Sequence, residues 1–539
     1  MVEAALVAGA LGCALLATAV VLPGRGWPFN HDALSAFERT EWFRRAFLAG
    51  DLFPTWTPFC FNGHGTPGPF FYHRLFYTAS GAVAAAGASS LGAVIVATVA
   101  FLAVGGLGMA RLGRALGWPA PLRLAAAALL ITAPYTYTDW LVRGALAELS
   151  SGMLVPWLFL AALRVARGTG SPARAGAALG VAWGLLFYAH VVIWLYATFV
   201  VALAFALAIA RRGRAGRRRD ALVSLVVTGA VLVAATGVYA LAIRRLGRHF
   251  SLDQLRIYYP TEMMQPPKRY LTVPMFAWGE EWQRFSIEIG RAVLLAIALL
   301  APIAIARGVR VGRAVLPLLG GTALAFFALQ LEVAAPFYRK VPLADVIQFP
   351  WRLVTFLAPA AIALACELAA AVARRACLSL RIAVTAIVLG VLASHAALAS
   401  RAQHIRYAWF GRDEIARGLE ALDGPWAGRE FLTRGVDPVP PRAPFVRAEG
   451  CVARAADGRD LAATVHFVRV ELEVDAPGRG CVLHVSQFAT PFVGVEGEGA
   501  TASRAADGTL DVAVAPGRRH VALVRRGVVA ALLADLAAP

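Results

Sequence analysis

The sequence predicts a mainly α-helical, polytopic membrane protein with a small β-sandwich domain at its carboxyl end. Of its 539 residues, 59% are apolar and 16% are charged, and the mean hydropathy is +0.63. A soluble domain is usually about 45–50% apolar and about a quarter charged. Apolar stretches of about 20 residues, each enough to cross the hydrocarbon core of a bilayer, recur between Leu6 and Ala397. This composition excludes a single water-soluble globule, a disordered chain and a small disulfide-rich protein.

About eleven transmembrane helices are expected. The first apolar segment has no basic residues before it and no clear cleavage site, so it is predicted to be an uncleaved helix rather than a signal peptide. The segment 75–87 is too short to span and is predicted to form a helix at the membrane interface. The expected spans are 4–22, 91–110, 121–138, 148–166, 173–188, 190–210, 221–243, 289–306, 314–332, 353–373 and 381–398.

Arginine residues predict the orientation of these spans. The net charge is +19 and arises almost entirely from arginine, since lysine occurs only at Lys268 and Lys340. The arginines gather in alternate short loops, which the positive-inside rule assigns to the cytoplasm together with the amino terminus. Charge at such loops is typical of membrane proteins, so no binding of nucleic acid is expected. The segments expected outside are 23–90, 139–147, 244–288, 333–352 and everything after residue 400.

Two domains follow from these patterns: a transmembrane domain, 1–400, and an extracytoplasmic β-rich domain, 401–539. Apolar and polar residues alternate in the second domain, and Asp-Gly and Pro-Gly turns separate the alternating runs, as in a small antiparallel β-sandwich. The alternating runs are 464–474, 481–485 and 510–514. The last apolar run, 528–536, is interpreted as a final strand or a frayed tail.

Two cysteines of the β-rich domain are predicted to form a disulfide. Cys451 and Cys481 lie on candidate strands and would face an oxidising compartment. The alternative is a pair of buried free thiols on strands too far apart to bridge.

The first outer loop holds residues suited to catalysis. His31 and Asp32 follow the first span, where a helical stretch that runs to about residue 49 begins. Asp32 is either an N-cap of that helix or a catalytic base that the cap holds rigidly at the membrane surface. Because Glu148 follows Arg143 by five residues at the start of a span, the two either form a salt bridge or bind substrate.

Other charged residues in outer loops have two interpretations each. Arg352 precedes a late span and either snorkels to the membrane interface or binds a phosphate with its guanidinium fork. Lys268 and Arg269 lie among aromatic residues that suit both sugar stacking and interface anchoring. Asp139 is placed to pair with Arg143 at a four-residue spacing, and His190, between two spans, is interpreted as structural.

Short motifs carry a resemblance to a known superfamily. They are His31-Asp32 after the first span, Gly50 to Trp56 with the pattern G-x-x-P-x-W, the turn Gly63-His64-Gly65-Thr66-Pro67, Arg143-Gly144 with Glu148, Phe349-Pro350-Trp351-Arg352, and the phrase from Phe488 to Phe492 with the later segment Val514 to His520. In this order they resemble the GT-C superfamily of membrane glycosyltransferases. Within it they are most similar to bacterial membrane proteins called 6-pyruvoyl-tetrahydropterin synthase-related and to the YfhO-like group.

The resemblance implies a GT-C-like fold in a bacterial cytoplasmic membrane. It also implies an inverting transfer of a sugar from a polyprenyl-phosphate donor to a glycan, lipid or protein acceptor of the cell envelope, on the outer face. Asp32 would be the base, with His31 beside it. Arg352, Arg143, Glu148, His64, Lys268 and Arg269 would bind substrate. The chain lacks the Asp-x-Asp pair of better-known relatives, so no metal ligands are assigned, although the superfamily leaves room for Mg²⁺ or Mn²⁺.

Two further classes of function suit a chain of this composition. A lipid or glycan transporter, or a flippase, usually has paired repeats with interrupted helices, and no such halves are visible. A non-catalytic envelope-assembly protein would use the β-rich domain for binding. The catalytic hypothesis differs from both because it requires Asp32 and Arg352 to face one outer cavity, within about 15 Å of each other around the reacting sugar.

The orientation can be tested by cysteine labelling of intact cells with an impermeant reagent. We expect no labelling of a cysteine introduced at position 215 and labelling at positions 60, 270 and 460, because the arginine-rich loops are cytoplasmic. Labelling at 215 without labelling at 270 would reverse the predicted topology.

Overall fold

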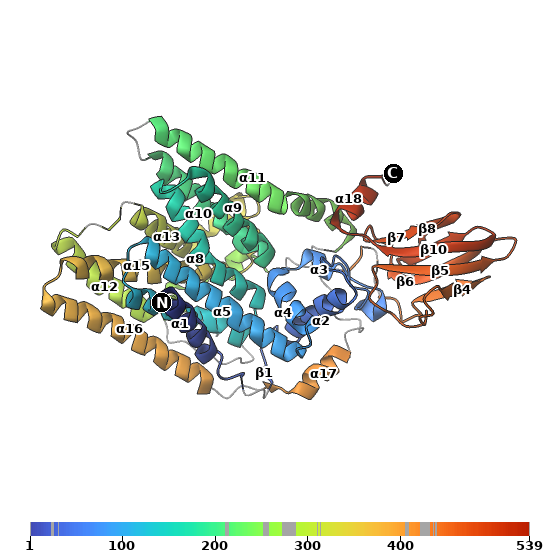
Figure 1. The fold of residues 1–539 in the computed structure, drawn as a ribbon, viewed down its shortest axis with the longest axis horizontal. Helices are drawn as coiled ribbons and strands as arrows, with labels where there is room; N and C mark the ends of the chain where they lie inside the picture. Colours follow the sequence, from blue (N-terminus) through green and yellow to red (C-terminus); the bar gives the residue numbers. More distant parts are fainter. Residues whose placement is uncertain are drawn as a thin grey trace. The chain divides into compact units, whose positions relative to one another are not determined.

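The computed structural model describes residues 2–22, 26–30, 32–210, 215–251, 258–271, 287–309, 311–312, 314–404, 409–420, 432–434, 436 and 439–537. Contacts within the chain divide it into two compact units (Figure 1). Unit 1 comprises Met1–Ala33, Val94–Ala235 and Ile257–Gly411, and unit 2 comprises Leu34–Ala93, Thr236–Arg256 and Arg412–Pro539.

Unit 1 is built from apolar helices around two central ones, α8 and α15. Helix α8 packs against α9 and α10, and α15 packs against α6, α8, α12 and α13. The apolar windows of α8 and of the α15 region are 94% and 83% buried, the highest shares among the candidate spans. The helices that lie wholly or mainly in unit 1 are α1 (Val2–Ala17), α5 (Ser90–Ala115), α6 (Ala120–Ile131), α7 (Pro134–Tyr137), α8 (Leu146–Arg167), α9 (Pro172–Ala189), α10 (Val191–Ala210), α11 (Ala215–Leu246), α12 (Arg291–Ala306), α13 (Gly321–Ala328), α14 (Ala335–Lys340), α15 (Val354–Arg375) and α16 (Leu378–His404).

Short elements connect these helices. Two are π-helical turns, η2 (Thr138–Arg143) and η8 (Leu316–Gly320), and a 3-10 turn, η11 (Pro350–Leu353), precedes α15. Strand β1 (Trp27–Pro28) pairs antiparallel with β2 (Trp409–Phe410), which ties the end of the first helical segment to the end of unit 1.

Helices lie at the positions of the predicted spans, but the expected count of about eleven transmembrane helices is not confirmed. Among the described residues, six helices are long and apolar enough to cross a membrane, and a bent pair, Leu316–Ala328 with Glu332–Lys340, would be a seventh. Several others are shorter; α6 ends at Ile131 because Ala133 is extended and Pro134 starts a new helix. The chain is thus a multi-pass membrane protein. The six helices are Ser90–Ala115, Leu146–Arg167, Val191–Ala210, Arg218–His249, Pro350–Arg375 and Leu378–Gln403.

Unit 2 contains the predicted β-sandwich. Its strands are drawn in orange and red in Figure 1. The two four-stranded antiparallel sheets have the strand orders β4-β5-β10-β7 and β3-β6-β9-β8. Burial alternates strictly along β5, where every second side chain enters the core. The strands are β3 (Val446–Glu449), β4 (Val452–Ala455), β5 (Arg469–Ala476), β6 (Cys481–Phe488), β7 (Val493–Glu496), β8 (Ala500–Arg504), β9 (Thr509–Val514) and β10 (Gly517–Arg525).

The interpretation of 528–536 as a strand or a frayed tail is wrong. This run forms helix α18 (Val528–Ala537), whose first turn closes with a hydrogen bond from Ala531 N to Gly527 O. An apolar run of this length fits a strand and a helix equally well, so periodicity alone does not separate the two. Burial of Ala531 and Leu532 holds one face of the helix inward.

The first outer segment folds with the sandwich in unit 2. It carries α2 (Ala33–Leu48), α3 (Gly68–Phe71) and α4 (Leu75–Ala85), and α17 (Arg412–Glu420) follows later in the chain. The helix predicted over 75–87 is therefore present as α4. A buried ion pair joins Asp51 Oδ1 to Arg525 Nη2 at 2.8 Å, and Trp56 donates to Gln487 Oε1 at 2.9 Å. The G-x-x-P-x-W segment thus packs on the ends of β6 and β10.

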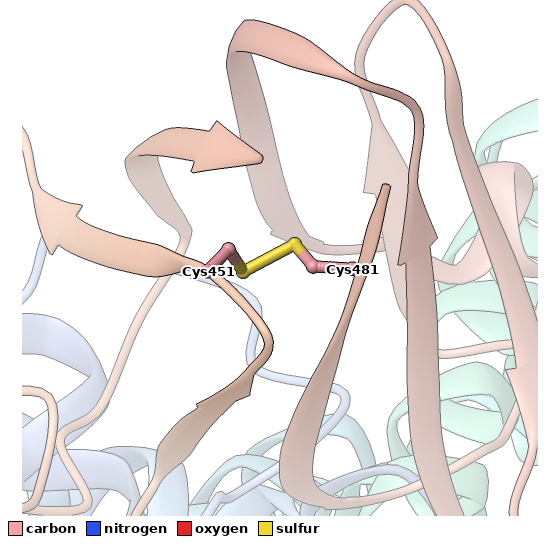
Figure 2. Close-up of a disulfide and its surroundings, with 2 residues drawn as sticks. All are labelled: Cys451 and Cys481. Carbon is pink, nitrogen blue, oxygen red and sulfur yellow. A yellow bond between two sulfur atoms is a disulfide. The ribbon is translucent and has the colours of Figure 1, made fainter. Parts of the chain in front are cut away.

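The predicted disulfide is confirmed. Cys451 lies between β3 and β4, which belong to different sheets, and its sulfur is bonded to that of Cys481 at the start of β6 (Figure 2). The two Cα atoms are 5.7 Å apart, which is within the usual range. The bond therefore fixes the chain where it crosses from one sheet to the other.

Removal of this bond should destabilise the sandwich. The disulfide closes a loop with a sequence separation of 30, so Cys451→Ala with Cys481→Ala should lower the free energy of unfolding by roughly 3–4 kcal/mol in the chain-entropy model. Limited proteolysis of the full chain should cleave the β-rich domain of this variant faster than that of the wild type. Cys377→Ala, at an exposed free thiol, is the matched control and should change nothing.

Candidate functional site

A cluster of buried charged side chains lies in unit 1 around the carboxylate of Glu148. Glu148 is in the first turn of α8 and its side chain is only 1% exposed. Oε2 lies 3.0 Å from Arg143 Nη2 and 3.2 Å from Arg352 Nε, and Oε1 accepts a hydrogen bond of 2.7 Å from the Tyr135 hydroxyl. The positive end of the α8 dipole favours a negative charge at this position.

Arg143 holds two carboxylates together. Its Nη1 lies 2.7 Å from Asp139 Oδ1, which is the predicted four-residue pair, and its Nη2 reaches Glu148. Nη1 also donates to the Tyr135 hydroxyl at 3.3 Å. Burial raises the pKa of the Asp139 carboxyl well above its usual range, and the charge of Glu148 acts in the same direction while Arg143 opposes both. Asp139 is therefore the carboxyl of this cluster that protonates more readily.

Arg352 approaches the cluster from the turn before α15. Phe349 is extended and Pro350 starts η11, as expected for a residue before a proline and for proline in a first helical turn. The guanidinium lies 4.8 Å from the centre of the Phe349 ring, and Nη1 donates to Ile347 O at 3.2 Å. Nε contacts Glu148 without the alignment of a hydrogen bond. The side chain is 17% exposed.

The segment that carries Asp32 is fastened to the same place. Asn30 donates through Nδ2 to Trp140 O and Leu141 O at 3.3 and 3.4 Å, and Asp32 N donates to Arg143 O at 3.0 Å. Gly144 makes this approach possible: its φ is +71°, and a Cβ there would lie 2.3 Å from Asn30 Oδ1. Asp32 is half-buried and immediately precedes α2.

His190 is near the cluster too. It ends α9, where its N–H donates to Leu186 O, and it lies within electrostatic range of Arg352 and Arg143. Its side chain is 4% exposed. A purely structural role for His190 stays a prediction. The residue lies in the surroundings of the two arginines.

The other predicted site residues have different surroundings. His64 is in unit 2, where its Nε2 lies 3.2 Å from Pro441 O and its ring packs against Phe488. Lys268 is exposed, and Arg269 donates to Gln265 Oε1 at 3.1 Å. His31 lies outside the described residues. Of the predicted site residues, Arg143, Glu148 and Arg352 are thus joined by side-chain contacts. The backbone N of Asp32 is hydrogen-bonded to Arg143 O.

A metal site is not formed by the residues that the structure describes. No group of three or more His, Cys, Asp or Glu side chains in the described ranges is arranged to hold a metal ion. The two carboxylates of the cluster, Asp139 and Glu148, both face Arg143. A site for Mg²⁺ or Mn²⁺ therefore does not fit this cluster.

Sequence reasoning missed two members of the arrangement. Tyr135 and Asn30 gave no signal, because neither has a charge or a characteristic spacing from the residues it contacts. Three cavities in the described part of unit 1, of about 390, 600 and 580 Å³, are lined by other residues. A cavity shared by Asp32 and Arg352 therefore stays a prediction.

Comparisons with known proteins give distant structural matches. No family model and no curated protein matches the sequence. Two solved structures of the arabinofuranosyltransferase AftD from Mycobacteria match 74% of this chain at 19% identity, with TM-scores of 0.47 and 0.45, and the chain covers 28% and 27% of those proteins. An oligosaccharyltransferase from Archaeoglobus fulgidus matches 81% of the chain at 11% identity, with a TM-score of 0.37 and 57% of its own length covered. The narrower likeness to the YfhO-like and 6-pyruvoyl-tetrahydropterin synthase-related proteins is not confirmed.

Substitution of Glu148 should damage unit 1. In Glu148→Ala, the buried guanidinium groups of Arg143 and Arg352 lose a shared counter-ion, and breaking a buried ion pair in this way costs about 3–5 kcal/mol. We expect a marked fall in the melting temperature of the purified protein. Glu332→Ala, at an exposed glutamate, is the control, for which a change within about 0.5 kcal/mol is expected. Equal melting temperatures for the two variants would contradict the central place of Glu148.

Proposed function

We propose that this chain is a membrane glycosyltransferase of the inverting type. It transfers a sugar from a polyprenyl-phosphate donor to a cell-envelope glycan, lipid or protein at the outer face of a bacterial cytoplasmic membrane. The observation that carries the proposal is the convergence of Arg143, Glu148 and Arg352 through side-chain contacts, with the backbone of Asp32 hydrogen-bonded to Arg143. These residues were singled out by a sequence resemblance to glycosyltransferases, and they come from three segments far apart in the chain.

Arg352 is the residue proposed to bind the donor phosphate. Among the described residues, no hydrogen bond is formed to its Nη2, whereas Nη1 and Nε are held by Ile347 O and Glu148. A guanidinium that is fixed on one side and open on the other can donate to a phosphate oxygen without reorganising. The carboxylate of Glu148 orients Arg352, and is a positioning residue in this scheme.

Arg143 is proposed to organise the site rather than to bind the donor. Both of its terminal nitrogens already face Asp139, Tyr135 and Glu148. Its backbone carbonyl accepts the Asp32 N–H, so the same residue fixes the acidic cluster and the start of the segment that carries Asp32. A base must be held in this way to abstract a proton with good geometry.

The proposed reaction is a single displacement. The acceptor hydroxyl loses its proton to the Asp32 carboxylate while its oxygen forms a bond to the anomeric carbon. The bond from that carbon to the phosphate oxygen breaks, and its electron pair leaves on the polyprenyl phosphate. Arg352 stabilises the negative charge that develops there. Inversion at the anomeric carbon follows from attack opposite the leaving phosphate.

Replacement of the base should abolish most of the transfer and spare the fold. Asp32 immediately precedes α2, and asparagine at such a position is as good an N-cap as aspartate. We expect transfer from a panel of labelled polyprenyl-phosphate sugars, measured in proteoliposomes, to fall by roughly 100-fold or more. Asp413→Asn, at the first turn of α17 in unit 2, is the matched control and should retain full activity.

Replacement of Arg352, the residue proposed to bind the phosphate, should weaken binding of the sugar donor. Arg352→Ala should raise the donor concentration needed for half-maximal rate by about tenfold or more, since a charged hydrogen bond is lost. Arg339→Ala, an exposed arginine of α14, should leave this concentration unchanged. If wild-type protein moves a labelled lipid across the bilayer and transfers no sugar, the chain is a flippase and the proposal fails.

A further inference from the structure

A cavity of about 600 Å³ lies between α12 and α16, away from the residues of the charge cluster. Its walls are apolar along most of its length, with Leu295 and Leu299 on α12 and Ile387 and Val391 on α16. The stretch of α12 from residue 291 to residue 299 is roughly 12 Å long at 1.5 Å per residue. The cavity is thus long enough for part of a hydrocarbon chain, and it is open to its surroundings, since Leu295 and Leu299 are 60% and 47% exposed.

Polar groups gather at one end of this cavity. Glu288, Arg291 and His395 all line it, and a Cβ on Gly290 would lie 3.9 Å from His395 Nε2. The start of α12 is therefore beside the last turns of α16, and the apolar walls extend away from this end. An apolar slot with one polar end is complementary to an amphiphile.

His395 presents a hydrogen-bond acceptor to the cavity. Thr132 Oγ1 donates its single proton to Ala128 O, so its contact of 3.3 Å with His395 Nδ1 requires Nδ1 to be the donor. In the neutral ring Nε2 is then the acceptor. His395 is 2% exposed, and Nε2 has no hydrogen-bond partner among the residues that the structure describes. A buried acceptor without a partner is costly, and a ligand that donates would remove that cost.

The charges at this end offset each other. Glu288 Oε1 accepts from both the backbone N and Nε of Arg291, at 2.8 and 3.1 Å, and its side chain is 2% exposed. The Nη1 and Nη2 atoms of Arg291 form no hydrogen bond among the described residues, and this side chain is 49% exposed, so the same end of the cavity also offers donors. A phosphate could accept from these donors but could not donate to His395 Nε2. A neutral headgroup that carries hydroxyl groups can donate to both His395 and Glu288.

We propose that the cavity between α12 and α16 binds a lipid of the bilayer with a neutral, hydroxyl-bearing headgroup, such as a sugar or another polyol. The headgroup donates to His395 Nε2 and to Glu288, and one hydrocarbon chain lies along Leu295, Leu299 and Val391. This site is separate from the one proposed for glycosyl transfer and does not depend on that function.

The cavity offers a substitution that fills it without disturbing its walls. Gly390 lines the cavity, and a Cβ at this position would have nothing within 4 Å. Gly390→Leu places a side chain in the slot and improves the helix propensity of α16. Gly229→Leu is the matched control, because Gly229 is also a helical glycine with open space around its Cβ, and it lies on α11.

The experiment is native mass spectrometry of the full-length protein with two added lipids that share the same acyl chains. One is monoglucosyl diacylglycerol, and the other is phosphatidylcholine, whose headgroup has no hydroxyl donor. We expect wild type and Gly229→Leu to retain the glucosyl lipid about tenfold better than phosphatidylcholine, as for one satisfied buried hydrogen bond. In Gly390→Leu the signal of bound glucosyl lipid should be lower than in wild type by about tenfold or more.

A second variant tests the role of the headgroup. His395→Phe preserves the size of the ring and removes the acceptor, so it should bind both lipids alike. If this variant does not fold, as judged by its melting temperature, Gly390→Leu alone still decides the matter. Equal retention of the two lipids by wild type, or identical binding by Gly390→Leu and Gly229→Leu, would overturn the proposal.

Discussion

The buried carboxylate of Glu148 is the constraint on which the arrangement of unit 1 depends. Two guanidinium groups, one from η2 and one from the distant η11, meet it. Arg143 also pairs with Asp139, whereas no carboxylate other than Glu148 pairs with Arg352 among the described residues. A buried ion pair adds little net stability compared with well-packed apolar side chains, because desolvation offsets most of the Coulomb attraction. Its loss is nevertheless expensive, so the cluster fixes the relative positions of α8, η2 and η11 far more strictly than apolar contacts would.

Much of the fold could be predicted because apolar runs and alternating runs each have one dominant interpretation when they are long. The helices of unit 1 occur where the sequence has extended apolar segments, and β5 shows the strict alternation that its sequence predicts. Short sequence patterns predicted the secondary structure less well, because a few residues fit more than one element. Residues 464–468 precede the strand rather than join it, β8 has no alternating burial, and the ten residues of α18 fit two periodicities.

The candidate site could be predicted only where contacts are local. Asp139 and Arg143 are four residues apart, so their pairing follows from spacing alone. Arg352 reaches Glu148 because α15 packs against α8, which no local pattern contains. Tyr135 and Asn30 join through a helix break at Ala133 and a left-handed glycine at Gly144, and both features are settled by tertiary packing. Several motif residues, among them Trp56 and His64, instead make contacts that hold unit 2 together.

The two proposed lipid sites of unit 1 differ in the direction of their hydrogen bonds, and this difference separates their ligands. At Arg352 the group that forms no hydrogen bond with any described residue is a charged donor, Nη2, which favours an oxyanion such as a lipid phosphate. At His395 the group without a hydrogen-bond partner among the described residues is an acceptor, Nε2, which favours a headgroup that can donate, such as a hydroxyl. Because hydrogen-bond polarity discriminates strongly in buried places, we expect the two sites to prefer different headgroups, although both proposed ligands present a hydrocarbon chain to the protein.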